Sequence, residues 1–399
     1  MQVRIKPSRA VGRVQAPPSK SYAHRLLIAA GIFCGGDISN VDFSNDINAT
    51  LFCLKEMGCV VKTIDNRIVI EPAKEIKGDH FQCGESGSTL RFMIPIVMTR
   101  SEKAIFTGSE KLFSRGIEPY LRIFEEKGIK YDLQSDSLKV EGRLKAGRYV
   151  LDASSSSQYI TGLLFALSTL SEDSEIILTG KFQSRSYVDI TIDVLQMVGV
   201  EIENRENGFF IRGGQKPNYL VKEVEGDYSN AAFLEALNLF GGDVKITGLN
   251  PDSKQGDKAY QIYFPMLQKG NCEIDVSESI DLGPILFTVA SYFHGATFKG
   301  TSRLRIKESN RIDDMMNTLA KFGAKYEVKE DEVIIFKSQL HPVDEVIDLV
   351  NDHRVVMSVI ILLTIFGGAI NGIEAIKKSF PSFLEVLEHL QVEVKYEIK

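Results

Sequence analysis

The sequence predicts a mixed α/β protein of two pseudo-threefold domains with buried helices. At 399 residues it is longer than one ordinary hydrophobic core supports, which favours two domains. A segment of one kind, apolar and rich in small residues, recurs six times along the chain. Between its copies lie amphipathic segments followed by short alternating stretches. A repeat of helix, strand, helix and hairpin accounts for all of these observations.

The apolar segment opens with polar residues and ends at a Gly turn that leads into a β-strand. Its six copies begin near residues 20, 88, 157, 229, 281 and 352. Small and apolar residues occur nearly all round each of these helices, so we expect them to be buried. Most starts lie about 70 residues apart, but the fourth and fifth are separated by only 52 residues.

The intervening segments carry the other signals, for example in residues 45–72, 187–213 and 309–336. Apolar residues at i, i+3 and i+4 predict an amphipathic helix in each segment. Alternating polar and apolar residues around DNR, REN or KED then predict a β-hairpin.

The repeat lengths also predict how the chain is divided into domains. The last repeat, from residue 351, has only 49 residues, and residues 1–16 would complete it. One domain is therefore expected from residues 1–16 plus 226–399, with repeats four to six. The other, residues 17–225, holds repeats one to three and is inserted into the first. The segment VEGDYSN, residues 224–230, is the predicted hinge at the second crossing.

The composition excludes several classes of protein. A net charge of −6 argues against a general nucleic-acid binder. The most apolar run, residues 355–366, is too short to span a bilayer, and the start MQVRIKPSRAVGRV has no apolar signal segment. The five cysteines and six histidines show no metal-ligand spacing, and no P-loop pattern occurs. We expect a cytoplasmic protein with reduced thiols, no membrane partner and no metal.

The stretch PPSKSYAHR places positive charge at the start of a predicted helix. Ser19 is the expected N-cap, and Lys20, Ser21 and Arg25 fall in the first turns. A helix N-terminus already carries about half a positive charge, so cations there are disfavoured unless an anion binds. The alternative is a capped surface helix with a solvated lysine and arginine.

All six apolar helices open with polar or charged residues, which suggests that several N-termini converge on one anion-binding cleft. The alternative for any single helix is a routine N-cap. The opening residues are Lys20 and Ser21; Ser88, Thr89 and Arg91; Ser156, Ser157 and Gln158; Asp227 and Ser229; Asp281; and Asp352, His353 and Arg354.

Seven motifs in a fixed order show a resemblance to a known family. They are PSKSYAHR (18–25), ESGSTLR (85–91), SSQYITGLL (156–164), SRSYVDIT (184–191), RIKESNR (305–311), NDHR (351–354) and KKSFPSF (377–383). Through them the chain resembles the 5-enolpyruvylshikimate-3-phosphate (EPSP) synthase family over essentially its full length.

The resemblance implies both a fold and a reaction. Members have two globular domains, each of three βαβαββ units arranged as an inside-out α/β barrel, with the active site in the cleft between them. They transfer the carboxyvinyl group of phosphoenolpyruvate to shikimate 3-phosphate and release phosphate, in the pathway to chorismate and the aromatic amino acids. No cofactor or metal is implied, and a monomer with these two small-molecule substrates is expected. Domain closure on binding of the first substrate is also expected.

The resemblance also assigns substrate-binding residues, and their chemistry fits two phosphates and two carboxylates. Shikimate 3-phosphate would be bound by Lys20, Ser21, Arg25, Ser156, Ser157, Gln158, Ser184, Tyr187, Asp281 and Lys307. Phosphoenolpyruvate would be bound by Lys20, Gly87, Arg115, Gln158, Arg311, Arg354 and Lys378. Gly87 would permit a close approach of the backbone to the ligand.

Carboxyvinyl transfer needs a base for the 5-hydroxyl and an acid for C3 of phosphoenolpyruvate. Asp281 matches the proton acceptor and Glu308 the donor, with Lys20 assisting. Whether Glu308 or Lys20 donates the proton stays open. Asp281 could instead serve only as the N-cap of the helix that follows it.

Three departures from the family pattern concern affinity and the response to glyphosate-like mimics rather than the reaction. Glu85 stands where many members have Asn, and Ser88-Thr89-Leu90 replaces Thr-Ala-Met. Gly116 follows Arg115 where Pro is common, which predicts a looser loop.

Two other functions compete with this interpretation. The sister family, UDP-N-acetylglucosamine enolpyruvyl transferase, typically has Lys-Asn at the position of Lys20-Ser21 and a reactive Cys in the loop that corresponds to residues 105–116. This chain has neither feature. A non-catalytic sensor of phosphorylated metabolites would not need both Asp281 and Glu308.

Overall fold

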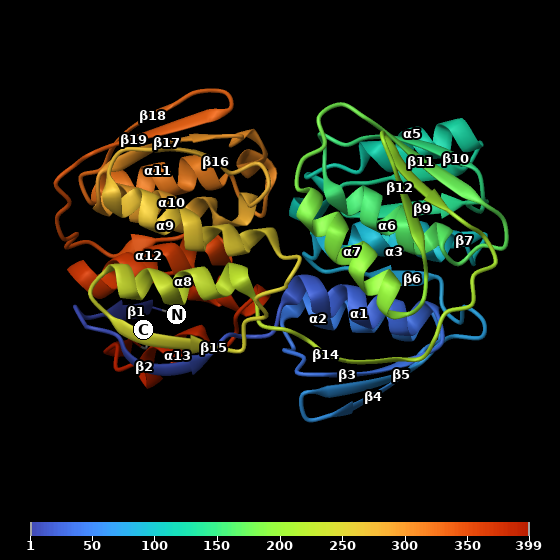
Figure 1. Cartoon of the computed structure of the whole chain (residues 1–399), viewed down its shortest axis with the longest axis horizontal. Coiled ribbons are helices and arrows are strands. Elements are labelled where there is room, and N and C mark those ends of the chain that lie inside the picture. Colours follow the sequence, from blue (N-terminus) through green and yellow to red (C-terminus); the bar gives the residue numbers. More distant parts are fainter. Residues whose placement is uncertain (1, 398–399) are drawn as a thin grey trace. The chain divides into compact units, whose positions relative to one another are not determined.

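The computed structural model describes residues 2–397 and contains two compact units, which are described separately (Figure 1). Unit 1 comprises the chain up to Pro17, Gly226–Pro251 and the chain from Gln255 onward. Unit 2 comprises Pro18–Glu225 together with Asp252–Lys254.

Unit 2 contains three four-stranded sheets of one topology. In each sheet the first two strands are parallel, and an antiparallel hairpin extends the second strand. In sheet order the strands are β14 (Leu220–Glu223), β3 (Gly36–Ser39), β5 (Arg67–Glu71) and β4 (Val60–Ile64); β6 (His80–Gln82), β7 (Lys103–Thr107), β9 (Ser137–Glu141) and β8 (Lys130–Leu133); and β10 (Arg148–Asp152), β11 (Ser174–Thr179), β13 (Gly208–Ile211) and β12 (Ile202–Arg205).

The helices of unit 2 are of two kinds. The buried kind comprises α1 (Lys20–Ile32), α3 (Gly87–Met98) and α6 (Ser157–Leu167). The amphipathic kind comprises α2 (Asn45–Glu56), α5 (Glu118–Lys127) and α7 (Arg185–Met197), and a short helix α4 (Glu110–Phe113) precedes α5. The predicted helix starts near residues 20, 88 and 157 are confirmed to within one residue.

Unit 1 repeats the same pattern with one shortened member. Its sheets, in strand order, are β16 (Glu273–Asp275), β17 (Gly295–Lys299), β19 (Glu332–Phe336) and β18 (Lys325–Val328); β20 (Ile347–Asp348), β21 (Gly368–Asn371), β1 (Gln2–Ile5) and β22 (Val394–Glu397); and the pair β15 (Asp243–Thr247) and β2 (Val11–Gln15). The fourth repeat is the two-stranded one. Its interval of 52 residues has no room for a hairpin.

The helices of unit 1 follow the same division. The buried helices are α8 (Tyr228–Leu239), α10 (Gly283–Tyr292) and α12 (His353–Phe366). The others are α9 (Tyr260–Lys269), α11 (Arg311–Lys321), α13 (Phe383–His389) and the 3-10 turns η1 (Gly256–Ala259), η2 (Ile280–Leu282), η3 (Ser302–Ile306) and η4 (Ile373–Lys378). Within residues 2–397, none of the helices combines the length and apolarity needed to cross a membrane.

Strand pairing departs from chain order at two points. β2 directly precedes α1 in the chain but pairs in parallel with β15 of unit 1. β14 precedes α8 but pairs in parallel with β3 of unit 2. Within unit 1, Asp227 N donates to Pro17 O at 2.7 Å, and within unit 2, Ser19 N donates to Glu225 O at 2.7 Å. In each unit, therefore, a backbone hydrogen bond joins the two chain segments at which the chain enters and leaves that unit.

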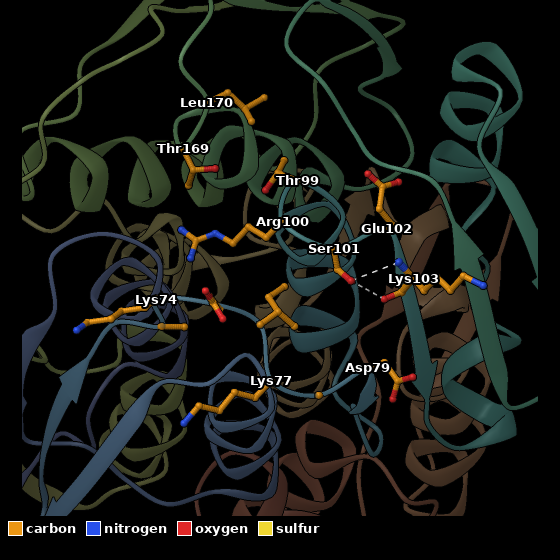
Figure 2. A pocket seen from close by; sticks show the side chains of 14 residues that line it. Lys74, Lys77, Asp79, Thr99, Arg100, Ser101, Glu102, Lys103, Thr169 and Leu170 are labelled. Atoms are coloured by element: carbon orange, nitrogen blue, oxygen red, sulfur yellow. Dashed lines mark hydrogen bonds between the residues drawn. The ribbon is translucent and has the colours of Figure 1, made fainter.

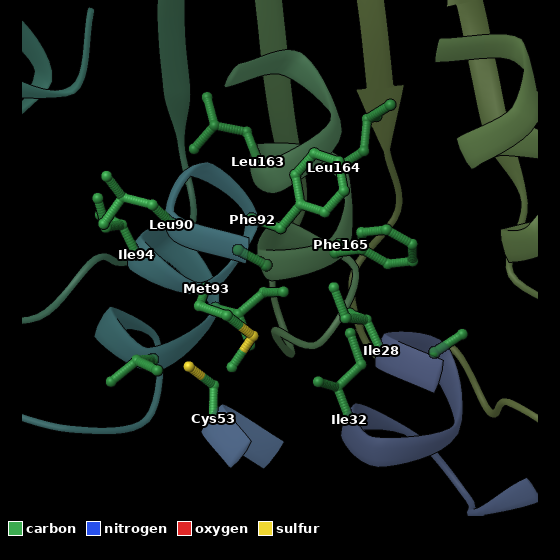
Figure 3. Close-up of a cluster of buried hydrophobic side chains, with 14 of the residues drawn as sticks. Ile28, Ile32, Cys53, Leu90, Phe92, Met93, Ile94, Leu163, Leu164 and Phe165 are labelled. Carbon is green, nitrogen blue, oxygen red and sulfur yellow. The ribbon is translucent and has the colours of Figure 1, made fainter. Parts of the chain in front are cut away.

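Each unit has its own hydrophobic core. In unit 2 the core centres on the packed pair α3 and α6, and α1 adds side chains such as Ile28, with Phe92 and Phe165 among the other members (Figure 3). Burial of each such side chain contributes about 1.5–3 kcal/mol to folding. This packing holds the polar first turns of the three helices close to one another.

Candidate functional site

The starts of α1, α3 and α6 form one polar cluster in unit 2. Ser19, Ser86 and Ser156 are the N-caps of these helices, and each side chain accepts a backbone N–H. Thr89 Oγ1 at the start of α3 donates to Asp46 O at 3.4 Å, and Gln158 Nε2 of α6 donates to Ser88 Oγ at 3.0 Å. These bonds join the start of α3 to the starts of α6 and α2, and α1 joins them through Lys20, which pairs with Asp46 of α2.

Lys20, in the first turn of α1, forms an ion pair with a carboxylate of α2. Its Nζ lies 2.8 Å from Asp46 Oδ2, and both side chains are largely buried. Asp46 itself lies in the first turn of α2, where a negative charge is favoured by the helix dipole. The pair holds the ammonium group in a fixed position at the edge of the cluster.

Arg25 is a buried cation whose hydrogen bonds all go to neutral groups. Its Nε donates to Thr191 Oγ1 at 2.8 Å, and its Nη atoms donate to Ser21 O, Tyr187 O and Thr161 Oγ1. No carboxylate within residues 2–397 forms an ion pair with it. Burial lowers its pKa to about 10, so it still carries its charge at neutral pH. An uncompensated positive charge of this kind attracts an anion.

A second pair of cations flanks Gly87 at the first turn of α3. A β-carbon on Gly87 would lie 2.9 Å from Arg91 Nη1 and 3.0 Å from Arg115 Nη1. Arg91 Nη1 also donates to Gln158 Oε1 at 2.8 Å. Two guanidiniums beside a bare backbone at a helix N-terminus suit a phosphate or carboxylate group.

The remaining predicted residues of unit 2 lie at the starts of α6 and α7. Ser157 is buried in the first turn of α6. Ser184 is the N-cap of α7 and is fully buried, with a positive φ of 55°. Tyr187 follows in the first turn of α7, where its carbonyl accepts from Arg25.

In unit 1 the predicted residues gather around Arg311, the first residue of α11. Its Nη1 lies 2.9 Å from Asp281 Oδ1, its Nη2 lies 2.6 Å from Glu308 Oε2, and its Nε lies 2.8 Å from Asp352 Oδ2. The guanidinium is only 1% exposed. Three carboxylates already offset its charge, so a substrate anion at this guanidinium would meet their repulsion.

Asp281 lies in η2 and forms ion pairs with three cations. Besides Arg311, its carboxylate lies 3.3 Å from Lys307 Nζ and 3.2 Å from Arg354 Nη2. Burial raises the pKa of Asp281, but Arg354, Lys307 and Arg311 together lower it further, to well below its ordinary value. The group is therefore ionised at neutral pH. The alternative that Asp281 only caps α10 is wrong, because α10 has no side-chain cap.

Arg354 lies in the buried first turn of α12, and Lys378, the last residue of η4, reaches the residues before that helix. Asp352 is the N-cap and accepts from Arg354 N at 2.9 Å, while Lys378 Nζ donates to Asn351 O at 2.8 Å. The side chains of Arg354 and Lys378 are both less than 9% exposed. Cations held this deeply beside a helix N-terminus are the arrangement that the sequence predicted for an anion.

Three residues of these clusters have no substrate or catalytic role in the predicted set. Arg91 and Asp352 are among the predicted opening residues of the helices, but the motifs assign them no part in binding. Asp46 is absent from the prediction altogether, because an acidic residue at a helix start is typical of a routine cap.

A cavity of about 940 Å³ in unit 2 lies away from these residues (Figure 2). It is lined by the loop of residues 73–79, the segment 99–103 after α3, and Thr169 and Leu170 after α6. The segments after α3 and α6 follow the C-terminal ends of two helices whose N-terminal ends carry the polar cluster, and the loop of residues 73–79 lies between β5 and β6. Arg100, which lines it, is pictured in Figure 2.

Among residues 2–397, no group of three or more His, Cys, Asp or Glu side chains is placed to hold a metal ion. The five cysteines are all unbridged.

The repeated α/β fold, with cations at the starts of buried helices and carboxylates among them, defines the class of the enolpyruvyl transferases. The family model for EPSP synthase (3-phosphoshikimate 1-carboxyvinyltransferase) matches residues 5–387. The 3-phosphoshikimate 1-carboxyvinyltransferase of Clostridium kluyveri is 38% identical, with 98% of each chain covered. That of Clostridium novyi is 37% identical, with 97% of this chain and 96% of the relative covered. The chain belongs to the EPSP synthase family.

Solved structures agree with this fold. EPSP synthase from Acinetobacter baumannii superposes with a TM-score of 0.79 over 99% of this chain and 100% of that chain, at 22% identity. The enolpyruvyl transferase NikO from Streptomyces tendae gives a TM-score of 0.80 over 99% and 98% of the two chains, at 12% identity. At these identities the likeness concerns the fold.

Proposed function

We propose that this enzyme transfers the carboxyvinyl group of phosphoenolpyruvate to the 5-hydroxyl of shikimate 3-phosphate and releases inorganic phosphate. The observation that carries the proposal is Asp281, an ionised carboxylate held among Lys307, Arg311 and Arg354. The three cations make Asp281 a weak base in the free protein. Bound substrate anions would offset their charge and raise the pKa of Asp281, so that it can accept a proton. Family membership supplies the identity of the two substrates.

The reaction is an addition followed by an elimination. In the first step the oxygen of the 5-hydroxyl attacks C2 of phosphoenolpyruvate, and Asp281 takes the proton of that hydroxyl. At the same time C3 of phosphoenolpyruvate gains a proton from Glu308 or Lys20. The tetrahedral product then loses phosphate as C3 returns a proton. The proposal requires that the clusters of both units act on the same pair of substrates.

The binding roles follow the resemblance, and the chemistry of the residues suits them. In unit 2, Arg25 with Ser156, Ser157, Ser184 and Tyr187 is assigned to the phosphate side of shikimate 3-phosphate, together with Lys20, Ser21 and Gln158. Lys307 and Asp281 of unit 1 complete this set. The set assigned to phosphoenolpyruvate is Lys20, Gly87, Arg115, Gln158, Arg311, Arg354 and Lys378.

The test is phosphate release from the two purified substrates, in wild type and in Asp281→Asn and Glu308→Gln variants. We expect each variant to lose at least about 100-fold in kcat, the usual contribution of a positioned acid or base. Glu330→Gln, an exposed carboxyl outside both clusters, is the matched control and should retain full activity. Full activity in both site variants would overturn the proton-transfer roles.

Replacing shikimate 3-phosphate with UDP-N-acetylglucosamine separates this proposal from the sister reaction. No phosphate release is expected with that acceptor. A monomer that acts in the cytoplasm is part of the proposal, and light scattering of the purified enzyme and cell fractionation would test these two points.

A further inference from the structure

The loop that carries Arg115 joins α4 to α5 and has an unusual backbone. Gly116 has a φ of +77°. Proline, whose ring fixes φ near about −65°, cannot adopt this conformation. The glycine was expected to leave the loop looser than a proline would. Its surroundings argue the opposite.

Two backbone carbonyls of the loop are held by buried donors. Gly116 O accepts from Tyr159 Oη at 2.9 Å and from Arg91 Nη2 at 3.1 Å. Arg115 O also accepts from Arg91 Nη2, at 3.4 Å. Tyr159 Oη in turn accepts from Arg91 Nε at 3.1 Å, which closes a ring of hydrogen bonds. Tyr159 and Arg91 are each 4% exposed, so water does not compete with these bonds.

The tyrosine is itself fixed in place. Its ring meets Tyr120 edge to face, with 5.0 Å between centroids, and the Arg91 guanidinium lies 5.3 Å from its centre. Tyr120 Oη donates to Arg91 O at 2.6 Å. That carbonyl needs an outside donor, because Pro95, four residues on in α3, has no N–H. Residues of α3, α5 and α6 therefore stabilise the hydrogen-bonded ring formed by Arg91, Tyr159 and Gly116.

The ring ends beside the anion-binding residues. Arg91 reaches the β-carbon position of Gly87 through Nη1, and Arg115 reaches the same position through its own Nη atoms. The backbone that the ring fixes is that of Arg115 itself. A shift of this backbone would move the Arg115 guanidinium away from the start of α3.

We propose that the Tyr159 hydroxyl is a positioning group for Arg115: it holds the Gly116 carbonyl and so fixes the Arg115 guanidinium for the phosphate or carboxylate of phosphoenolpyruvate. The hydroxyl thereby compensates for the absence of a stiffening proline at position 116. This inference rests on the proposed function in assigning Arg115 to phosphoenolpyruvate. Tyr159 touches no substrate in this role.

Tyr159→Phe tests the proposal, because it removes only the hydroxyl and keeps the ring contacts with Tyr120 and Arg91. The KM for phosphoenolpyruvate should rise about fivefold to tenfold, the effect of one neutral hydrogen bond. The KM for shikimate 3-phosphate and kcat should stay within about twofold. A purely structural role would move both KM values or lower the melting temperature without this split.

Tyr149→Phe is the matched control. Its hydroxyl also donates to a backbone carbonyl in unit 2, that of Lys145, and the side chain is 1% exposed. It should leave both KM values unchanged. An unchanged KM for phosphoenolpyruvate in Tyr159→Phe, or an equal rise for both substrates, would overturn the proposal.

A second measurement does not depend on the reaction. Amide hydrogen exchange at residues 114–118 should be faster in Tyr159→Phe than in wild type or Tyr149→Phe. If wild type releases no phosphate, the proposed function fails, and the exchange experiment still tests the ring. Unchanged exchange in Tyr159→Phe would overturn the ring even in an active enzyme.

Discussion

Lys307 shows how a residue's surroundings set its chemistry. Burial lowers its pKa to about 8, although the neighbouring Asp281 acts to raise it. The side chain is therefore charged below about pH 8 and becomes neutral above it. A cation assigned to the phosphate side of shikimate 3-phosphate should lose its effect over that range.

We therefore expect kcat/KM for shikimate 3-phosphate to fall as the pH rises above about 8, since this ratio reports ionisations of the free enzyme. Lys307→Arg, whose guanidinium stays charged, should move that fall to higher pH. Initial rates between pH 6 and 10 would show the shift. A fall that stays at the same pH in Lys307→Arg would assign it to another group.

Asp352 combines a helix cap with an ion pair at full burial. Its Oδ1 accepts from Arg354 N, and its Oδ2 accepts from Arg311 Nε. Asp352→Asn keeps a good N-cap but loses the charge. We expect a loss of about 1.5–3 kcal/mol in the free energy of unfolding, the range for a hydrogen bond to a charged group.

Urea denaturation would measure this loss for Asp352→Asn. Asp344→Asn, an exposed change in the same unit, should alter the free energy of unfolding by less than about 0.5 kcal/mol. Equal values for the two variants would contradict a structural role for the Arg311–Asp352 pair.

At the scale of elements, α3 and α6 approach each other at a glycine. A β-carbon on Gly162 would lie 2.5 Å from Arg91 O and 3.0 Å from Pro95 Cγ. Gly162 thus allows the close contact that places Gln158 of α6 beside Arg91 of α3. The missing side chain of Gly162 also leaves room for the Tyr120 hydroxyl.

Gly162→Ala should destabilise the protein by about 1–3 kcal/mol, because overpacking outweighs the better helix propensity of alanine. Thermal unfolding followed by circular dichroism would measure it. Gly270→Ala is the control: its position is open and its φ of 163° is extended backbone. A neutral Gly162→Ala would show that α3 and α6 can separate without cost.

At the scale of the whole molecule, the places where the chain passes from one unit to the other predict that each unit folds alone. Pro17 and Asp227 are joined by a backbone hydrogen bond, so residues 1–17 can be linked directly to residues 226–399. We expect this shortened chain to unfold cooperatively in denaturant. A version that begins at residue 6 lacks β1, the strand between β21 and β22, and should not fold. Cooperative unfolding of both versions would contradict the role of β1.

Much of the fold could be predicted from the sequence. Helix starts, the amphipathic helices and the hairpins of residues 45–72, 187–213 and 309–336 follow from periodicity, which depends on local burial alone. The partners of β2 and β14 could not be predicted. Residues 1–16 were expected to complete the sixth repeat, but β2 pairs with β15 of the fourth repeat, and β14 pairs with β3 of the first. Such pairings join segments far apart in the chain, which local periodicity does not report.

The candidate site was predictable to a similar degree. Residues of matched motifs, such as Arg25, Asp281 and Arg354, lie at helix starts as the sequence suggested. Their partners were not predictable. The hydrogen-bonded ring of Arg91, Tyr159 and Gly116 joins two helices and a loop. No one of these three segments has a sequence pattern that predicts contact with the other two segments.

The sequence by itself determined the number of repeats, the burial of six helices and the cations and serines at their starts, since spacing and polarity are properties of each segment. Only the tertiary structure decided which charges meet. Asp281 is ionised because folding surrounds it with Arg354, Lys307 and Arg311, whose charges outweigh its burial. Lys307 has a lowered pKa because folding removes it from water. These pKa shifts depend on the distances between charged groups, and those distances are set only when the chain has folded.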